Sequence, residues 1–387
     1  MATDIYLDNS MTTRPSKRSI SKMLPILTER WGHPSSPHHK GQAVFPDIKE
    51  SMLAIYELLG ANHQDDFVFT SSGAEAVNHV VNAIYFDQTL EAGRNHLITS
   101  NIDEAPAIMA IGRLEEMSCV GKMVDANSRG SVSAQIIADA LSPRTALVSL
   151  SWANGMTGVI NPVEEIAELC EDRGVFFHLD ATHVLGKMFF DLSDIKATHI
   201  TFNGDNLHAP KGSGGIWIKG GRHCTSFIVG GIEQAGLRAG SYSIANLAAL
   251  GEAARESLDA RDLMCTEVAR LRNKLEEGVA NGYSGAFPFF QDEERIPNVT
   301  AIAFPGIANE ALLFNLNRRG ICACIGGGSF QQIGLVLENS GVERSLAHSA
   351  VSFSLSRETT EMEIDCAIEI IIEEALRLRK ISEKMDV

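Results

Sequence analysis

The chain has 387 residues, of which 44% are hydrophobic and 21% charged, as in soluble globular proteins. Its 49 acidic side chains outnumber the 33 basic ones, which gives a formal net charge of −16. This acidic excess argues against nucleic acid and anionic membrane surfaces as direct partners. The length suits one large domain or two ordinary ones with a substantial core.

Neither a membrane span nor an export signal is predicted. No apolar run reaches the roughly 18 residues of a membrane helix, because the longest candidate, residues 368–376, contains Glu369, Glu373 and Glu374. The N-terminal residues lack the basic and apolar regions of a signal peptide. Seven cysteines without paired spacing suit a reducing compartment, so we expect a cytoplasmic protein.

The first two thirds of the chain alternate between strand and helix patterns. An apolar run at residues 67–70 leads through a Ser-Ser-Gly turn into a helical pattern at 75–84. Later, strands are predicted at 145–150 and 175–180, on either side of a helix at 161–174. We expect Asn161 to cap this helix, with Pro at its first position. Such a strand–helix–strand unit implies a parallel sheet with a right-handed crossover.

Further strands at 198–202 and 215–218 continue this pattern, and the C-terminal third then changes character. Strands are predicted at 299–304 and 350–355. A Thr-x-x-Glu capping box opens an amphipathic helix over 360–375. We therefore expect a large α/β domain followed by a smaller C-terminal α+β domain.

Residues 200–215 resemble the cofactor-lysine segment of NifS/IscS-type cysteine desulfurases, which are class V aminotransferase relatives of pyridoxal 5′-phosphate (PLP) fold type I. The family reads approximately Leu-Ser-Gly-His-Lys-Phe-Tyr-Gly-Pro-Lys-Gly-Xaa-Gly, and a shared Gly and a shared Pro-Lys-Gly fix the register. The family's Ser and His then correspond to Asn203 and Asp205, and its Schiff-base Lys to Asn206. An amide cannot form an imine, so the resemblance implies a cofactor site without its covalent anchor.

The likeness extends over nearly the whole chain in order. Residues 6–13 resemble the family's Tyr-Leu-Asp-Asn-Asn-Ala-Thr-Thr signature, and 31–36 resemble its Gly-Asn-Pro-Ser-Ser loop. The resemblance implies fold type I, with a large domain of mostly parallel sheet at 16–250 and a smaller α+β domain formed by 1–15 and 251–387. It also implies a homodimer whose active sites borrow residues across the subunit boundary.

Ser71, Ser72 and Gly73 match the family loop that cradles the cofactor phosphate at a helix N-terminus, where backbone N–H groups and the helix dipole favour an anion. The family's phosphate-binding Thr is Ala74 here, so one hydroxyl donor is missing. On the phosphate side, Arg-Ala-Gly-Thr of the family becomes Arg-Ala-Gly-Ser, ending at Ser241. A phosphate site and an ordinary capped turn both fit this loop.

The ring-binding positions are partly retained. Asp180 matches the Asp that pairs with the pyridinium nitrogen of PLP. His183 replaces the Gln that donates to the cofactor's phenolate oxygen. The family's stacking His falls on Glu104 or Ala105, depending on a one-residue gap, and neither side chain stacks on a ring.

The family's reactive groups are replaced. Its nucleophilic Cys corresponds to Ser329, which cannot hold a persulfide and is a weak nucleophile without an adjacent base. Cys322 and Cys324 lie upstream between apolar residues and are predicted to be buried. The Arg that binds the substrate carboxylate becomes Ser352.

These losses favour a catalytically inactive homodimer kept for binding or regulation, with no covalently bound cofactor. Its protein partner would be an active paralogue, a sulfur acceptor or an assembly protein of iron–sulfur metabolism. A second hypothesis is an enzyme that uses PLP noncovalently, or runs another reaction, through His183, Asp180, Asp205 and Ser329. A third is an ordinary active desulfurase.

Overall fold

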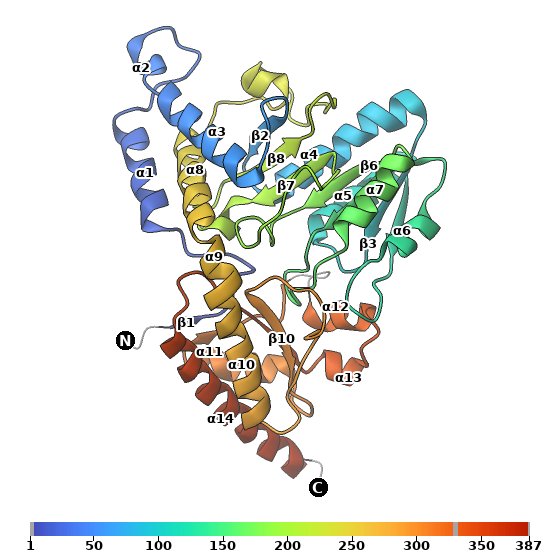
Figure 1. Ribbon diagram of the computed structural model, residues 1–387, viewed down its shortest axis with the longest axis vertical. Helices are drawn as coiled ribbons and strands as arrows, with labels where there is room; N and C mark the ends of the chain where they lie inside the picture. Colours follow the sequence, from blue (N-terminus) through green and yellow to red (C-terminus); the bar gives the residue numbers. More distant parts are fainter. Residues whose placement is uncertain (1–3, 328–331, 386–387) are drawn as a thin grey trace.

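The computed structural model describes residues 4–327 and 332–385. Within them, a seven-stranded sheet in the order β2-β8-β7-β6-β5-β3-β4 forms the centre of a large lobe (Figure 1). Its strands are β2 (Asp66–Thr70), β3 (His96–Ser100), β4 (Val120–Val124), β5 (Thr145–Ser151), β6 (Phe176–Asp180), β7 (His199–Asn203) and β8 (Gly214–Ile218). Strand β8 is antiparallel to both neighbours and the other pairs are parallel, which confirms the predicted mostly parallel sheet.

Helices cover both faces of this sheet (Figure 1). Alternation along β5 directs Leu147 toward the core under α4 and α5, and Val148 toward the core shared with α3, α7 and α8. The helical elements of this lobe are α1 (Lys17–Thr28), α2 (His39–Gln42), α3 (Phe45–Leu59), α4 (Gly73–Ile84), η1 (Tyr85–Leu90), α5 (Ala105–Glu115), α6 (Ala134–Ala140), α7 (Val163–Asp172), η2 (Gly204–Leu207), η3 (Glu233–Gly236) and α8 (Ile244–Asp259).

The predicted strand–helix–strand unit is β5–α7–β6, but its helix begins differently. Helix α7 starts at Val163, after Pro162, and its N-terminus has no side-chain cap. The buried Asn161 side chain instead accepts the Val132 N–H at 2.8 Å and donates to the Ser151 carbonyl at 2.7 Å. The prediction of Asn161 as the cap was wrong, because its amide satisfies the Val132 N–H and the carbonyl at the end of β5, contacts that the local sequence does not reveal.

A smaller lobe lies below the first (Figure 1). Its antiparallel sheet has the order β12-β10-β9, and a separate parallel pair joins β1 to β11. The strands are β1 (Ile5–Tyr6), β9 (Phe287–Pro288), β10 (Val299–Ala303), β11 (Ile321–Cys322) and β12 (Ala350–Ser354). The helices are α9 (Arg261–Leu263), η4 (Met264–Val268), α10 (Ala269–Gly282), α11 (Asn309–Arg318), α12 (Ile333–Asn339), α13 (Arg344–Ala347) and α14 (Glu361–Met385).

The predicted capping box opens α14. The Glu363 N–H donates to Thr360 Oγ1 at 3.3 Å, and the Thr360 N–H donates to Glu363 Oε2 at 2.8 Å. The division into domains at residue 250 stays a prediction; residue 250 itself lies inside α8, which packs against the large lobe.

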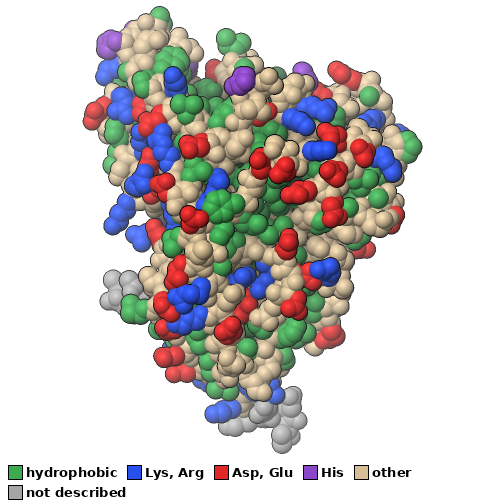
Figure 2. Space-filling view, in the orientation of Figure 1, with side chains coloured by type: hydrophobic (Ala, Val, Ile, Leu, Met, Phe, Trp, Pro, Cys, Tyr) green, Lys and Arg blue, Asp and Glu red, His purple; other side chains and the backbone are tan. Residues whose placement is uncertain are grey.

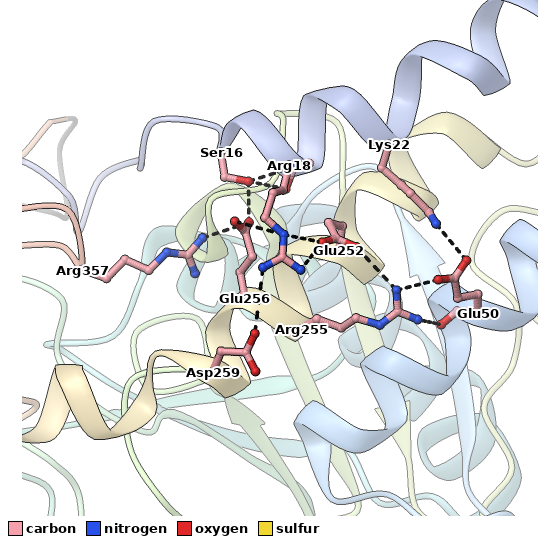
Figure 3. A network of polar contacts seen from close by, with 10 residues as sticks. Ser16, Arg18, Lys22, Glu50, Glu252, Arg255, Glu256, Asp259 and Arg357 are labelled. Carbon is pink, nitrogen blue, oxygen red and sulfur yellow. Dashed lines mark hydrogen bonds and ion pairs between the residues drawn. The ribbon is translucent and has the colours of Figure 1, made fainter.

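A polar network ties the lobes together (Figure 3). Arg357, which follows β12 in the small lobe, reaches Glu256 on α8 with Nη2 3.1 Å from Oε2. Glu256 also accepts a hydrogen bond from Ser16, before α1, and lies 3.9 Å from Arg18. Each charged group thus has an opposite partner.

The face in Figure 2 shows acidic and basic side chains interspersed. Among the described residues, none of the helices is both long enough and apolar enough to cross a membrane.

Candidate cofactor and ligand site

A cavity of about 370 Å³ lies at the carboxyl edge of the large sheet. Strands β2, β3, β6 and β7 run in the same direction, so the residues that follow or end them meet at one edge. A short N-terminal segment adds Ser10 and Met11. The lining residues are Ser10, Met11, Ser72, Gly73, Ala74, Glu104, Ala105, Pro106, Asp180, Thr182, His183, Asn203 and Asn206.

Six predicted cofactor positions line this cavity, namely Ser72, Gly73, Asp180, His183, Asn203 and Asn206. Ser71 and Ser241 are exposed and are not in its lining. Ser329 lies outside the described residues.

Asn206 is held in place by the N-terminal segment. It lies in η2 directly after β7, and 3% of its surface is exposed. Its Nδ2 donates to the Ser10 carbonyl at 2.7 Å, and its Oδ1 accepts from Asn203 Nδ2 at 3.2 Å. Both ends of the amide are therefore used in joining β7 to the chain's beginning, and the side chain has no amine chemistry to offer.

No lysine is found in the described lining of the cavity. Lys211 is largely exposed and its Nζ donates to Thr12 Oγ1 at 2.8 Å. Lys187 lines a separate space of about 20 Å³ on which Asn206 also borders. Burial lowers the pKa of Lys187 to about 8, but a space of this size holds about one water molecule and no cofactor.

Asp205 does not line the cavity. Its buried carboxylate accepts from Thr12 Oγ1 at 2.7 Å and from Asn203 Nδ2, and Lys211 Nζ lies 3.7 Å away. Its carbonyl accepts the Thr13 N–H at 2.9 Å. This residue therefore fixes the N-terminal segment over the turn after β7.

Several donors at the anion-binding end of the cavity already have acceptors within the chain. Asn203 Oδ1 accepts the Gly73 N–H at 3.1 Å. The Ser71 N–H donates to Glu75 Oε2 at 2.8 Å, and Ser72 Oγ caps α4 by accepting the Glu75 N–H at 3.2 Å. Arg238 Nε is 2.9 Å from Glu75 Oε1, so this cation is paired as well.

The ring end keeps a carboxyl group, Asp180, that has no ion-pair partner among the described residues. Asp180 ends β6, and its Oδ1 accepts the Thr182 N–H at 3.0 Å. Burial raises the pKa of Asp180, and the nearby Glu104 carboxylate raises it further. A carboxyl group in this environment gains from a cationic partner such as a pyridinium nitrogen.

Glu104 and His183 form a hydrogen-bonded contact that sequence analysis missed. Their Oε1 and Nε2 atoms are 3.1 Å apart, and Glu104, at the start of α5, makes no capping bond there. The His183 ring fits because Gly155 lies beneath it: a Cβ at Gly155 would lie 2.4 Å from the ring. The two positions are 79 residues apart, so no local pattern could pair them.

The remaining catalytic positions have structural contacts. Ser352 Oγ, in the buried strand β12, donates to the Met156 carbonyl at 2.7 Å and is absent from the cavity lining. Cys322 and Cys324 are half-buried, so the prediction that both are buried was wrong. Cys322 lies in β11, which pairs with the two-residue strand β1 and so has less cover than a central strand. Burial raises the pKa of Cys324 to about 12.

PLP therefore fits this site at one end only. Asp180 suits the ring nitrogen. At the phosphate end, the Gly73 N–H and Arg238 already have acceptors. The Asp205 carboxylate also accepts a hydrogen bond from Asn203 there, which adds negative charge near the phosphate position. The described residues do not fit the family's cofactor with its phosphate.

The fold and the position of the site at the carboxyl edge of the sheet define a PLP-dependent transferase fold of type I. The chain matches the Aminotransferase class-V family model over residues 5–366 and belongs to that family, which is PLP-dependent.

Within this family, the chain is similar to NifS-type cysteine desulfurases. It is 34% identical over 383 residues to Cysteine desulfurase NifS of Azotobacter vinelandii, covering 98% of this chain and 94% of that protein. It is also 34% identical over 384 residues to a cysteine desulfurase of Gluconacetobacter diazotrophicus, with 98% and 95% covered. A solved NifS-like protein superimposes with a TM-score of 0.90 at 27% identity, over 97% of this chain and 100% of that one.

Proposed function

We propose that this chain is a cysteine desulfurase-like protein that lacks desulfurase activity and serves a binding or regulatory role. The observation that carries the proposal is Asn206, whose amide is hydrogen-bonded to the Ser10 carbonyl and to Asn203 where the family's imine lysine belongs. Without that lysine the protein lacks both the covalent anchor and the base that moves the substrate's α-proton.

Other positions support the same conclusion. The substrate-arginine position is Ser352, whose hydroxyl is bound to the Met156 carbonyl. Ser329 stands at the nucleophile position. Cys324 is the cysteine nearest in sequence to Ser329. Its pKa is raised to about 12, so little of the nucleophilic thiolate is present at neutral pH.

We infer that the protein acts as a cytoplasmic homodimer with a protein partner, and without nucleic acid or membrane. The similarity to proteins named cysteine desulfurases supports a role in sulfur metabolism. An active paralogue, a sulfur acceptor or an iron–sulfur assembly protein would be the partner class.

A second candidate function is favoured by Asp180. Its carboxyl group, which has no ion-pair partner among the described residues, supports an enzyme that holds PLP noncovalently, or runs another reaction in the same cavity with His183. A third, active cysteine desulfurase chemistry, is favoured by the relatives' names alone.

The test is the absorbance spectrum of the protein as isolated, together with sulfide release from L-cysteine. We expect no visible band that borohydride bleaches, and no sulfide above the level of heat-denatured protein. Asn206→Lys should recover cofactor binding at most, because the thiol and the carboxylate-binding arginine are still missing. A borohydride-sensitive chromophore in the unmodified protein, or sulfide production by Asn206→Lys alone, would contradict the proposal.

A further inference from the structure

We infer that the 370 Å³ cavity binds a small organic cation with an apolar body and no phosphate group. This inference rests on the proposed function, because a covalently held PLP would fill the same space. The proposed ligand is positively charged, whereas the family's cofactor, PLP, carries a negatively charged phosphate.

The charge of the lining supports a cation. Its acidic members are Asp180 and Glu104, and within the described lining the only basic side chain is His183, already 3.1 Å from Glu104. The nearby cations are held elsewhere: Arg238 pairs with Glu75 at 2.9 Å, and Lys211 donates to Thr12. An anion entering the cavity would meet carboxylates without a free positive charge.

One backbone donor that would hold a phosphate, the Gly73 N–H, is also consumed. Asn203 Oδ1 accepts the Gly73 N–H at 3.1 Å, and its Nδ2 donates to Asp205 and to Asn206. The absence of a side chain at Gly73 favours this contact, since a Cβ there would lie 3.0 Å from the Asn203 Cβ, closer than an ordinary van der Waals contact. A phosphate would have to displace Asn203 from the N-terminus of α4 before it could use that N–H.

Unpartnered polar atoms show that the cavity is built to receive hydrogen bonds. Ser10 Oγ and His183 Nδ1 are buried and have no partner in the described chain, and both residues are at least nine-tenths buried in the lining. Apolar atoms of Met11, Ala105 and Pro106 complete the wall. A volume near 370 Å³ is in the range of small-ligand sites.

Together these features point to a protonated amine or nitrogen heterocycle. Its N–H⁺ group would donate to the Asp180 carboxylate, as charge-assisted hydrogen bonds are stronger than neutral ones. Burial raises the pKa of Asp180 because the ionised form is poorly solvated there. A bound cation would stabilise the ionised carboxylate and lower this pKa. Its apolar body would contact Met11 and Pro106.

The experiment uses two probes that differ only in a phosphate, pyridoxamine and pyridoxamine 5′-phosphate, measured by calorimetric titration of the full-length protein. We expect pyridoxamine to bind at least about tenfold more tightly, the factor for one charge-assisted contact. Asp180→Asn and Glu104→Gln should each weaken pyridoxamine binding by about tenfold. The matched control Glu369→Gln removes one charge from the exposed surface of α14 and should change nothing.

Asn203→Ala supplies the reverse test, because it frees the Gly73 N–H. Its affinity for pyridoxamine 5′-phosphate should rise relative to the unmodified protein. The control Asn78→Ala removes a half-buried amide on α4 that is absent from the cavity lining, and it should leave this affinity unchanged. Thermal melting of each variant confirms folding. Pyridoxamine binding that is no tighter than that of its phosphate, including no binding, overturns the inference. PLP that binds tightly but dialyses away without an imine also overturns it while leaving the proposed function intact; a borohydride-trapped imine overturns the proposed function first.

Discussion

Two polar regions of this molecule differ in how their charges are matched. In the network between the lobes, Glu256 faces Arg357, Arg18 and Ser16 (Figure 3). In the described lining of the cavity, Asp180 and Glu104 are the acidic side chains, and the one basic side chain, His183, contacts Glu104. Matched charges hold a scaffold together, whereas unmatched buried charge is costly and marks a place where a ligand can contribute. The comparison separates what maintains the fold from what is available for function.

The largest effect should come from breaking the matched region. Arg357→Ala leaves the Glu256 carboxylate, 14% exposed, without its principal cation, and we expect a loss of roughly 2–3 kcal/mol in the free energy of unfolding, measured with urea. The control Lys196→Ala breaks a more exposed pair with Glu171 and should cost under about 0.5 kcal/mol. Equal losses in both variants would show that burial does not distinguish these pairs.

Asp180→Asn should have the opposite sign in the ligand-free protein. A carboxyl group whose folded pKa is raised favours folding while it is protonated and loses that contribution as the pH rises through the folded pKa. The variant should therefore be more stable than the unmodified protein at pH 8, on the order of 1 kcal/mol, with the difference shrinking toward pH 4. Urea unfolding at both pH values measures it; a pH-independent difference would mean that Asp180 is already neutralised.

The smallest effect concerns thiol chemistry beside the cavity. Burial, together with the Asp8 carboxylate, raises the pKa of Cys324 to about 12, so we expect almost no alkylation by iodoacetamide at pH 8. Cys366, exposed on α14, is the internal control and should be labelled first. Peptide mass spectrometry measures the extent of alkylation at both cysteines. Faster labelling of Cys324 than of Cys366 would reveal an activated thiol and weaken the contrast between the two regions.

Local sequence predicted most of the scaffold and half of the site. The strand–helix–strand unit, the capping box at Thr360 and the position of Asp180 at the end of a strand follow from periodicity and capping, which depend on neighbouring residues. The absence of an amine at Asn206 also follows from residue identity and register. The NifS-like family likewise could be inferred from motif order.

Tertiary structure decided how the cavity is charged. The contacts Glu104–His183 and Gly73–Asn203 join positions 79 and 130 residues apart, and whether a donor is free or consumed depends on those contacts. The predicted Asn161 cap was wrong for a related reason, since its amide hydrogen-bonds Val132, 29 residues away, and Ser151 at the end of β5. Residue order alone determined which chemistry the chain lost. Only folding, which brings remote side chains within hydrogen-bonding distance, determined which chemistry the emptied site can still support.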